Sequence, residues 1–403
     1  MRDKAMTVSR RSFCAGTLMV LGHRALGSAP RRPVEGYALV AHTDRRRILN
    51  AAKRYVELPV QTITSFPTSR SPGGLHDYFS QADYFWPNPA DPGGKYINRD
   101  GQSNPENFND HRKAMIALSV QMPALSAAWL LTRDGRYGRH AAEHLRAWFI
   151  TPETRMNPNL EYSQGVHGVS TGRSYGIIDT LHLVEVARAA SLVAPAMLTQ
   201  AEQAALLDWF REYLHWMKTS EKGIAERQTL NNHAVCWALQ AAEFARLIAD
   251  EETRDEVRNQ YKTVFVPDQM GPDGSFPKEL ARTKPYSYSI FNFDVMAMLC
   301  QSLEQDLFAF ALPDGRGICK GAAFLYPYLL DKGTWPYPKD VEHFDSLPVR
   351  SPGLLFAGLA CGHQEYVQLW TRLNPDPTDP EIIRNYPVRQ PLLWLAARSR
   401  AHV

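Results

Sequence analysis

One segment in the second half of the chain places an amide and an imidazole side by side, ahead of an apolar stretch with helical spacing. It reads Asn231-Asn232-His233. An asparagine here is a common helix N-cap, which accounts for one of the two. Asn232 and His233 would then lie in the first helical turn, near free backbone N–H groups, where they can hold an anionic carboxylate. A histidine in such a place is also often structural, so the segment alone does not establish a site.

A second segment carries cations and phenols just before another apolar stretch. Residues 273–288 read DGSFPKELARTKPYSY and include Arg282, Lys284, Tyr286 and Tyr288. A guanidinium group pairs with a carboxylate, and a phenol can exchange a proton. Taken by itself, the segment reads equally well as a polar loop with solvated charges.

Together the two segments resemble the alginate lyase superfamily of polysaccharide lyases. In family 5 the matching elements carry the active site, which implies catalytic roles for Asn232, His233, Arg282 and Tyr288, although the spacing from Arg282 to Tyr288 is one residue shorter here. Other stretches resemble the related family 38 more closely, namely DYFWPNP at 83–89 with RDG at 99–101, and PNLEY at 158–162 with TGRSYGIID at 171–179. The resemblance covers over half of the chain and rests on the order and combination of these motifs.

This resemblance implies cleavage of a uronic acid polymer by β-elimination, with no metal or cofactor. It favours polymannuronate (alginate) or glucuronan and leaves polyguluronate open. Asn232, with Arg282 or His233, would neutralise the carboxylate beside C5, where negative charge develops. Tyr288 would transfer the proton, either as base and then acid, or as acid with His233 as base. We expect Arg282 or a protonated His233 to lower the pKa of Tyr288.

Six further residues are candidates for holding the polymer. Arg173 and His167 would bind flanking carboxylates, and Tyr84 and Trp86 would cover sugar rings, with Lys284 and Tyr286 beside the catalytic arginine. Each has an ordinary alternative, such as a buried ion pair, a structural histidine or a packed ring.

Three other functions compete with this interpretation. A glycoside hydrolase needs two facing carboxylates, for which Glu161, Asp179 and Glu279 are available without forming an evident pair. A non-catalytic uronan-binding protein would not require the tyrosine beside an arginine. A metal enzyme is suggested only by His140 and His144, whose spacing fits an HxxEH motif that a solvated helix face explains equally well.

Helical periodicity dominates the chain, and alternating β-branched runs are scarce. It predicts helices over residues 111–132, 136–149, 177–193, 202–217, 231–249, 252–265, 291–310, 318–330 and 353–373. Short connections rich in Gly, Pro and Asn predict antiparallel hairpins. Carried around a ring, these hairpins give an all-α fold, an incomplete (α/α) toroid. Periodicity alone does not separate a toroid from an α-solenoid.

Residues 71–109 interrupt the helical pattern with Gly, Pro, Asn, Asp and aromatic residues. A loop of this length inside a domain is usually functional or disordered, and the aromatic content argues against disorder. We interpret it as a lid or groove wall, with a packed structural loop as the alternative.

The N-terminus predicts export. Arg10-Arg11 precede a weakly apolar stretch, and small residues follow at 27–29, which is typical of a twin-arginine signal peptide. Residues 1–29 are therefore assigned to the signal and residues 30–403 to a single catalytic domain. We expect a periplasmic or secreted protein without a membrane-spanning helix.

Charge and cysteine content exclude some partners. Residues 1–29 hold five basic side chains and one acidic side chain, so the remainder carries −1 rather than the +3 of the whole chain. No dense basic run follows residue 47, which argues against nucleic acid as a partner, and no protein partner is indicated. Cys14 lies in the signal, and without a CxxC pair we expect the other four cysteines to be buried free thiols.

Overall fold

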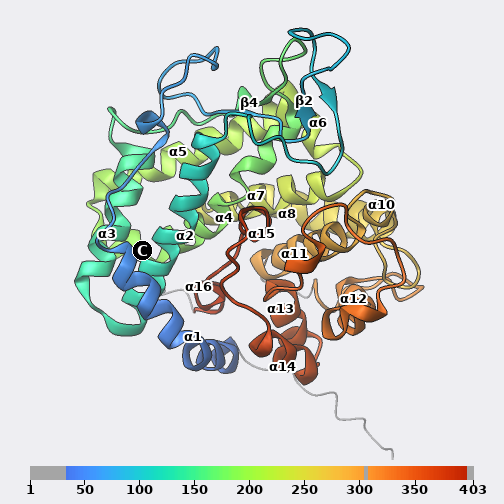
Figure 1. Ribbon diagram of the computed structural model, residues 1–403. Coiled ribbons are helices and arrows are strands. Elements are labelled where there is room, and N and C mark those ends of the chain that lie inside the picture. The colour runs from blue at the N-terminus through green and yellow to red at the C-terminus, as the bar shows by residue number, and fades with distance from the viewer. Residues whose placement is uncertain (1–32, 304–306, 397–403) are drawn as a thin grey trace, which may run out of the picture.

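The computed structural model describes residues 33–303 and 307–396. The signal segment, with Arg10, Arg11 and Cys14, lies outside the described residues. The elements within them are almost entirely helical, and they are arranged as a ring (Figure 1).

Five helices form the inner layer of the ring. In order around the ring they are α2 (Asp110–Thr132), α4 (Leu183–Met197), α7 (Asn232–Ile248), α11 (Pro285–Leu303) and α13 (Pro352–Ala360). Each packs against the next, so their side chains are buried on most faces. α2 is long and apolar enough to cross a membrane, but 67% of its most apolar stretch is buried inside the protein, as in an ordinary core helix.

A second layer packs outside the first and pairs with it as helical hairpins. It consists of α1 (Pro33–Tyr55), α3 (Gly135–Leu145), α5 (Gln200–Thr219), α8 (Glu251–Gln260), α12 (Ile318–Leu330) and α14 (Gln364–Arg372). α16 (Pro391–Leu395) contacts α1, α2 and α4, and so returns the C-terminal segment to the beginning of the ring. The predicted all-α toroid is thereby confirmed.

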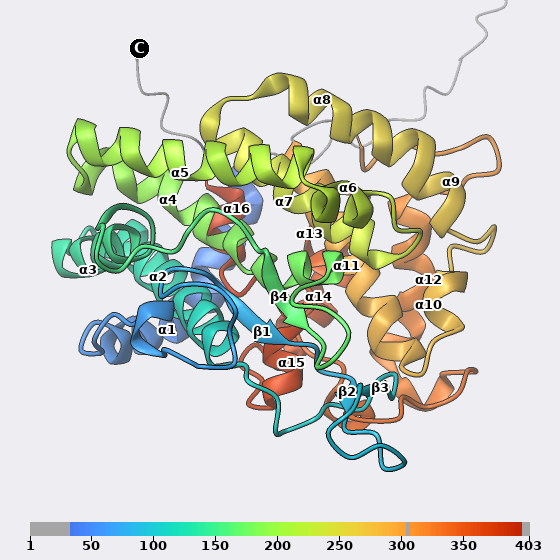
Figure 2. The same cartoon turned by 90° about the horizontal axis from the view of Figure 1, so that it is seen from above.

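Short elements fill the connections. The helical ones are α6 (Glu221–Arg227), α9 (Val266–Gln269), α10 (Pro277–Leu280), α15 (Pro380–Arg384), single 3₁₀ turns at Ile63–Ser65, Ser174–Thr180, Lys332–Thr334 and Phe344–Ser346, and π turns at Arg146–Ile150 and Tyr261–Phe265. β1 (Phe79–Gln81) pairs in parallel with β4 (Tyr162–Gly165), and β2 (Phe85–Trp86) pairs antiparallel to β3 (Ile97–Asn98). Both small sheets lie on the same side of the ring, as Figure 2 shows from above.

The observed helices differ from the predicted ones most clearly in three places. α1 was not predicted at all. The helix predicted over 353–373 is broken by a turn, because Gly362 adopts a φ of +81° that ends the helical path between α13 and α14. α11 begins at Pro285 rather than at 291, which places Tyr286 and Tyr288 in its first turn. This last difference decides where the two phenols point.

The expectation of four free thiols is wrong for one pair. Cys319 and Cys361 form a disulfide, with Cα atoms 5.9 Å apart, whereas Cys236 and Cys300 are free and buried. The bond joins the start of α12 to the end of α13, two helices that pack together. Because the two cysteines are 42 residues apart in sequence, only tertiary packing could reveal that their geometry permits a bond.

The C-terminal segment is held against α4 by one buried carboxylate. Glu185 accepts the backbone N–H groups of Arg389 and Gln390 at 2.9 and 2.8 Å. Burial raises the pKa of Glu185 to about 7, although the two N–H groups oppose the shift. This anchor fixes the path of the segment that also carries α15.

Replacing Glu185 should therefore destabilise the fold. We expect Glu185→Ala to lower the free energy of unfolding by about 3 kcal/mol, because two buried N–H groups lose their acceptor. Denaturant unfolding followed by circular dichroism measures this change. The control is Glu256→Ala, whose partly exposed carboxylate pairs loosely with Lys218 and Arg227 and should cost less than about 1 kcal/mol. Equal effects of the two variants would contradict the anchor.

Candidate active site

A cavity of about 480 Å³ opens on the side of the ring that carries the small sheets. The 71–109 loop, the Ser174–Thr180 turn, the starts of α7 and α11, and α15 all contribute to its wall. Its lining residues are Asp83, Tyr84, Phe85, Asn98, Asp100, Arg112, Gln164, Arg173, Tyr175, Ile178, Asp179, Leu181, His182, Asn231, Asn232, His233, Arg282, Tyr288, Phe291, Arg384 and Asn385. The loop thus forms a wall of the cavity.

The start of α7 presents Asn232 and His233 to this cavity. The Asn231 side chain accepts the N–H of His233 at 3.2 Å, so it is the N-cap. Asn232 is held by Glu279, whose two carboxylate oxygens accept its backbone N–H at 2.9 Å and its Nδ2 at 2.8 Å. Burial raises the pKa of Glu279, with the two Asn232 bonds opposing the shift. One Nδ2 hydrogen of Asn232 remains available for a ligand.

His233 is oriented from two sides. Its Nδ1 lies 2.6 Å from Oε1 of Glu226, and its ring meets the edge of Tyr175 with the ring centres 5.0 Å apart. The ring lines the cavity, so Nδ1 faces the protein and Nε2 is the nitrogen available to a ligand.

Arg282 and Tyr288 form a second group in the wall. Asp100 accepts Nη2 of Arg282 at 2.8 Å and Nε at 3.3 Å, and the guanidinium carbon lies 4.6 Å from the centre of the Tyr288 ring. Burial alone would raise the pKa of Asp100. The hydrogen bonds and charge of Arg282 have a larger, opposite effect, so the pKa of Asp100 is below its usual value. The Tyr288 hydroxyl lies 3.1 Å from that of Tyr84.

The expected lowering of the Tyr288 pKa is wrong for the free protein. Burial raises the pKa of Tyr288 well above its ordinary value, and Tyr84 adds to the increase. Arg282 opposes the shift, but its effect is smaller than the cost of placing a phenolate away from water. Tyr288 is therefore a neutral phenol at neutral pH, so it can donate its proton directly, whereas a role as base requires its minor phenolate form.

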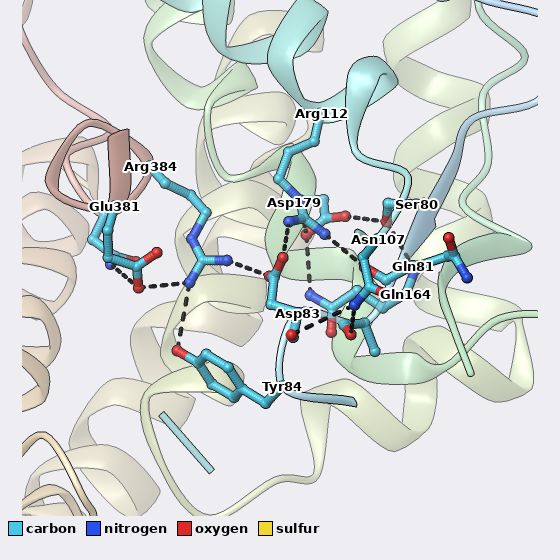
Figure 3. A network of polar contacts seen from close by, with 12 residues as sticks. Ser80, Gln81, Asp83, Tyr84, Asn107, Arg112, Gln164, Asp179, Glu381 and Arg384 are labelled. Atoms are coloured by element: carbon cyan, nitrogen blue, oxygen red, sulfur yellow. Dashed lines mark hydrogen bonds and ion pairs between the residues drawn. The ribbon is translucent and has the colours of Figure 1, made fainter. Parts of the chain in front are cut away.

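A network of buried charges forms the floor of the cavity (Figure 3). Asp83 lies between two arginines, with Arg112 of α2 at 2.5 Å and Arg384 of α15 also in contact. Although burial raises the pKa of Asp83, Arg112 and Arg384 together bring it below its usual value. Arg384 also donates to Glu381 at 2.7 Å and to the Tyr84 hydroxyl at 3.4 Å. The floor thus connects the loop, α2 and the C-terminal segment.

None of the three carboxylates considered for hydrolysis stands free in the cavity. Glu161 lies outside it and bonds Trp216 and Lys222. Asp179 accepts bonds from Tyr78, Ser80 and Gln164 and pairs with Arg112. Both carboxylate oxygens of Glu279 accept hydrogen bonds from Asn232. A hydrolase requires one carboxylic acid that keeps its proton and faces a second carboxylate across the bond, and this arrangement is not seen among the described residues.

The substrate-binding candidates divide into two groups. Tyr84 and Arg173 line the cavity. Trp86 lies beside it, donating Nε1 to Gln102 O, and His167 lines a separate groove with Arg70 and Tyr96. Lys284 is buried behind Tyr84, near Glu342 and Glu381. Tyr286 is fully buried and donates its hydroxyl to Tyr328 O, because it points into the core from the same helical turn that directs Tyr288 to the cavity.

The His140–His144 pair is separate from the cavity. His140 contacts Glu143 and the Leu58 carbonyl oxygen, while burial lowers the pKa of His144 to about 3. Within residues 33–303 and 307–396, no group of three or more His, Cys, Asp or Glu is placed to hold a metal ion. Near the start of α2, His111 accepts the backbone N–H of Phe79 at Nδ1, and its Nε2 lies 3.0 Å from the Phe66 carbonyl oxygen.

Several cavity residues were missed by sequence reasoning. Asp83 and Asp100 lie inside the DYFWPNP and RDG motifs, but neither motif reveals that these carboxylates pair with arginines. Arg112 follows the predicted helix start without any distinguishing pattern. Arg384 and Asn385 lie about 100 residues beyond the second catalytic segment, and no local signal connects them to it.

Comparison with known proteins gives a family match and several similar structures. The model of the family described as alginate lyase matches residues 62–335. An alginate lyase from Bacteroides ovatus has a similar crystal structure, with a TM-score of 0.77 and 25% identity over 91% of this chain and 99% of that chain. Alginate lyase A1-III from Sphingomonas species A1 is more distant, with a TM-score of 0.49 and 14% identity over 82% and 88%. A search of curated proteins gave no match.

Proposed function

The chain belongs to the alginate lyase family, and from this premise we propose that it cleaves the 1,4-linkages of a uronic acid polymer, alginate in the first place and glucuronan in the second, by β-elimination. Membership makes it a polysaccharide lyase. The choice of alginate, and of Asn232, His233, Arg282 and Tyr288 as the reacting groups, is the proposal. The observation that carries it is the convergence of these four side chains on one cavity.

The chemistry requires neutralisation before proton transfer. Removing the C5 proton places negative charge beside a carboxylate that is already anionic, so the carboxylate must first be bound by donors. The free Nδ2 hydrogen of Asn232 and the guanidinium of Arg282 are suited to its two oxygens. Because Asp100 fixes Arg282 from the other side, the guanidinium is positioned before the substrate arrives.

The stereochemistry of the sugar decides which residue is the base. In D-mannuronate the C5 proton and O4 lie on the same face of the ring, so Tyr288 acts first as base and then as acid. D-Glucuronate has the same configuration at C4 and C5, which makes glucuronan a second candidate substrate. In L-guluronate the proton and O4 lie on opposite faces, so His233 takes the proton while Tyr288 protonates O4.

Two tyrosines of one helical turn provide a matched test. Tyr288→Phe should abolish formation of the unsaturated product from polymannuronate, measured as absorbance of the new C4–C5 double bond. Tyr286→Phe, two residues away and outside the cavity, should keep wild-type activity and lose about 1 kcal/mol of stability with its buried hydrogen bond. Reducing ends formed without the double bond would indicate a hydrolase, and binding without cleavage would indicate a uronan-binding protein.

The pH dependence tests the state of Tyr288. Because burial raises the pKa of Tyr288, its phenolate is a small fraction at neutral pH, and that fraction grows about tenfold per pH unit. We therefore expect kcat/KM on polymannuronate to rise with pH between roughly 6 and 9. Initial rates in buffers of constant ionic strength measure the profile, and circular dichroism verifies that the protein stays folded. A flat profile would argue against Tyr288 as the base.

We also propose that the protein is exported. Arg10-Arg11 provide the signal pattern, and the Cys319–Cys361 disulfide is a bond that persists in oxidising compartments. Changing both arginines to lysine should retain the protein in the cytoplasm, while the wild-type chain appears in the periplasm or medium. Cell fractionation with immunodetection measures the distribution, and equal export of both forms would refute the signal.

A further inference from the structure

Glu226 is a buried carboxylate whose role the four catalytic residues do not explain. It lies in the last turn of α6, it is fully buried, and Oε1 lies 2.6 Å from His233 Nδ1. Oε2 has no hydrogen-bond partner among the described residues. Burying a carboxylate is costly unless a donor or cation compensates it, and here the compensating group is the histidine that lines the cavity.

This contact determines which histidine nitrogen faces the ligand. An ionised carboxylate only accepts hydrogen bonds, so Nδ1 must carry the proton that lies between the two groups. Nε2 then keeps its lone pair towards the cavity whenever the ring is neutral. When Nε2 takes a proton, the anion beside Nδ1 stabilises the imidazolium that forms. The same orienting principle operates in carboxylate–histidine pairs of hydrolases and metal sites.

Resting on the proposed function, we propose that Glu226 is the positioning residue that makes His233 a base for linkages whose C5 proton lies opposite O4. Glu226 would thus set the ability of this chain to cleave next to L-guluronate. Cleavage next to D-mannuronate, in which Tyr288 both takes and returns the proton, would depend on it much less.

In this step His233 takes one proton from the sugar and Tyr288 gives one proton back. The C5–H bond breaks and its proton joins Nε2 of His233, while the electron pair forms the C4–C5 double bond. The C4–O4 bond breaks, and O4 takes the proton of Tyr288. The resulting imidazolium and phenolate are restored when the proton on Nε2 returns to Tyr288 through solvent. The raised pKa of Tyr288 suits this route, because its proton is already present for O4.

The geometry around His233 supports this assignment. Tyr175 makes a T-shaped contact with the His233 ring, the ring lines the cavity, and Glu279 is engaged with Asn232. Arg173, which also lines the cavity, donates to Gln164 rather than to Glu226. Glu226 is therefore the acceptor that orients the imidazole.

The test compares two polymers with one variant. Glu226→Gln keeps the size of the side chain and an oxygen for Nδ1 but removes the charge. We expect kcat/KM on polyguluronate to fall on the order of 100-fold, mainly through kcat, and on polymannuronate by less than about threefold. The control is Glu161→Gln, which neutralises a carboxylate that also contacts α6, through Lys222, but lies outside the cavity. It should leave both rates unchanged.

Other outcomes overturn the inference. Equal losses on both polymers would mean that Glu226 only supports the fold, and no loss would mean that its charge is irrelevant. Wild-type activity on polymannuronate alone would remove the proposed base role. Absence of unsaturated product from any polymer would instead refute the proposed function itself. If Glu226→Gln does not fold by circular dichroism, Glu226→Asp keeps the charge but withdraws it from Nδ1, and the same selective loss on polyguluronate is expected.

Discussion

The position of Asp83 between two arginines is the interaction on which the cavity depends. Arg112 comes from an inner helix and Arg384 from near the C-terminus, so three distant segments meet at one buried carboxylate. Removing one partner from such a cluster leaves an uncompensated charge, at a cost of about 3–5 kcal/mol. Because Tyr84 follows Asp83 directly, the cluster also sets the position of the hydroxyl that contacts Tyr288. The 71–109 loop is thus held against the ring by the ion pairs of Asp83 as well as by packing.

The distribution of charge in the cavity suits a polyanion. Asp83, Asp100 and Asp179 each pair with an arginine, so no cavity carboxylate among them is left to repel a uronate. Arg173 differs, because its side chain donates hydrogen bonds to the neutral Gln164 and its guanidinium lies against the rings of Phe85 and Tyr175. Burial lowers the pKa of Arg173. An anionic ligand would supply the countercharge that this cation lacks among the described ion pairs.

The surroundings of Tyr288 and His233, the two groups proposed to transfer protons, differ. The environment that raises the pKa of Tyr288 disfavours its phenolate and favours it as an acid. His233 has a different partner, because the Glu226 carboxylate lies 2.6 Å from Nδ1 and leaves Nε2 as the nitrogen available to a ligand. One cavity can therefore offer a proton donor and a proton acceptor at the same pH. The contact to Tyr288 comes from far along the chain, since Tyr84 is 204 residues away, whereas Glu226 precedes His233 by only 7 residues.

The sequence by itself determined the helical composition, most helix positions and the two segments that reach the cavity. Those features depend on short-range patterns, such as apolar spacing, N-caps and motif order, which are written along the chain. Helix α1, the Cys319–Cys361 bond and the roles of Arg112 and Arg384 depend instead on contacts between distant segments. Tyr286 and Tyr288 illustrate the limit most directly. Both are tyrosines of one motif, and only the true start of α11 decides that one enters the core and the other the cavity. The raised pKa of Tyr288 follows in the same way, because desolvation is a property of the packed fold and not of the residue.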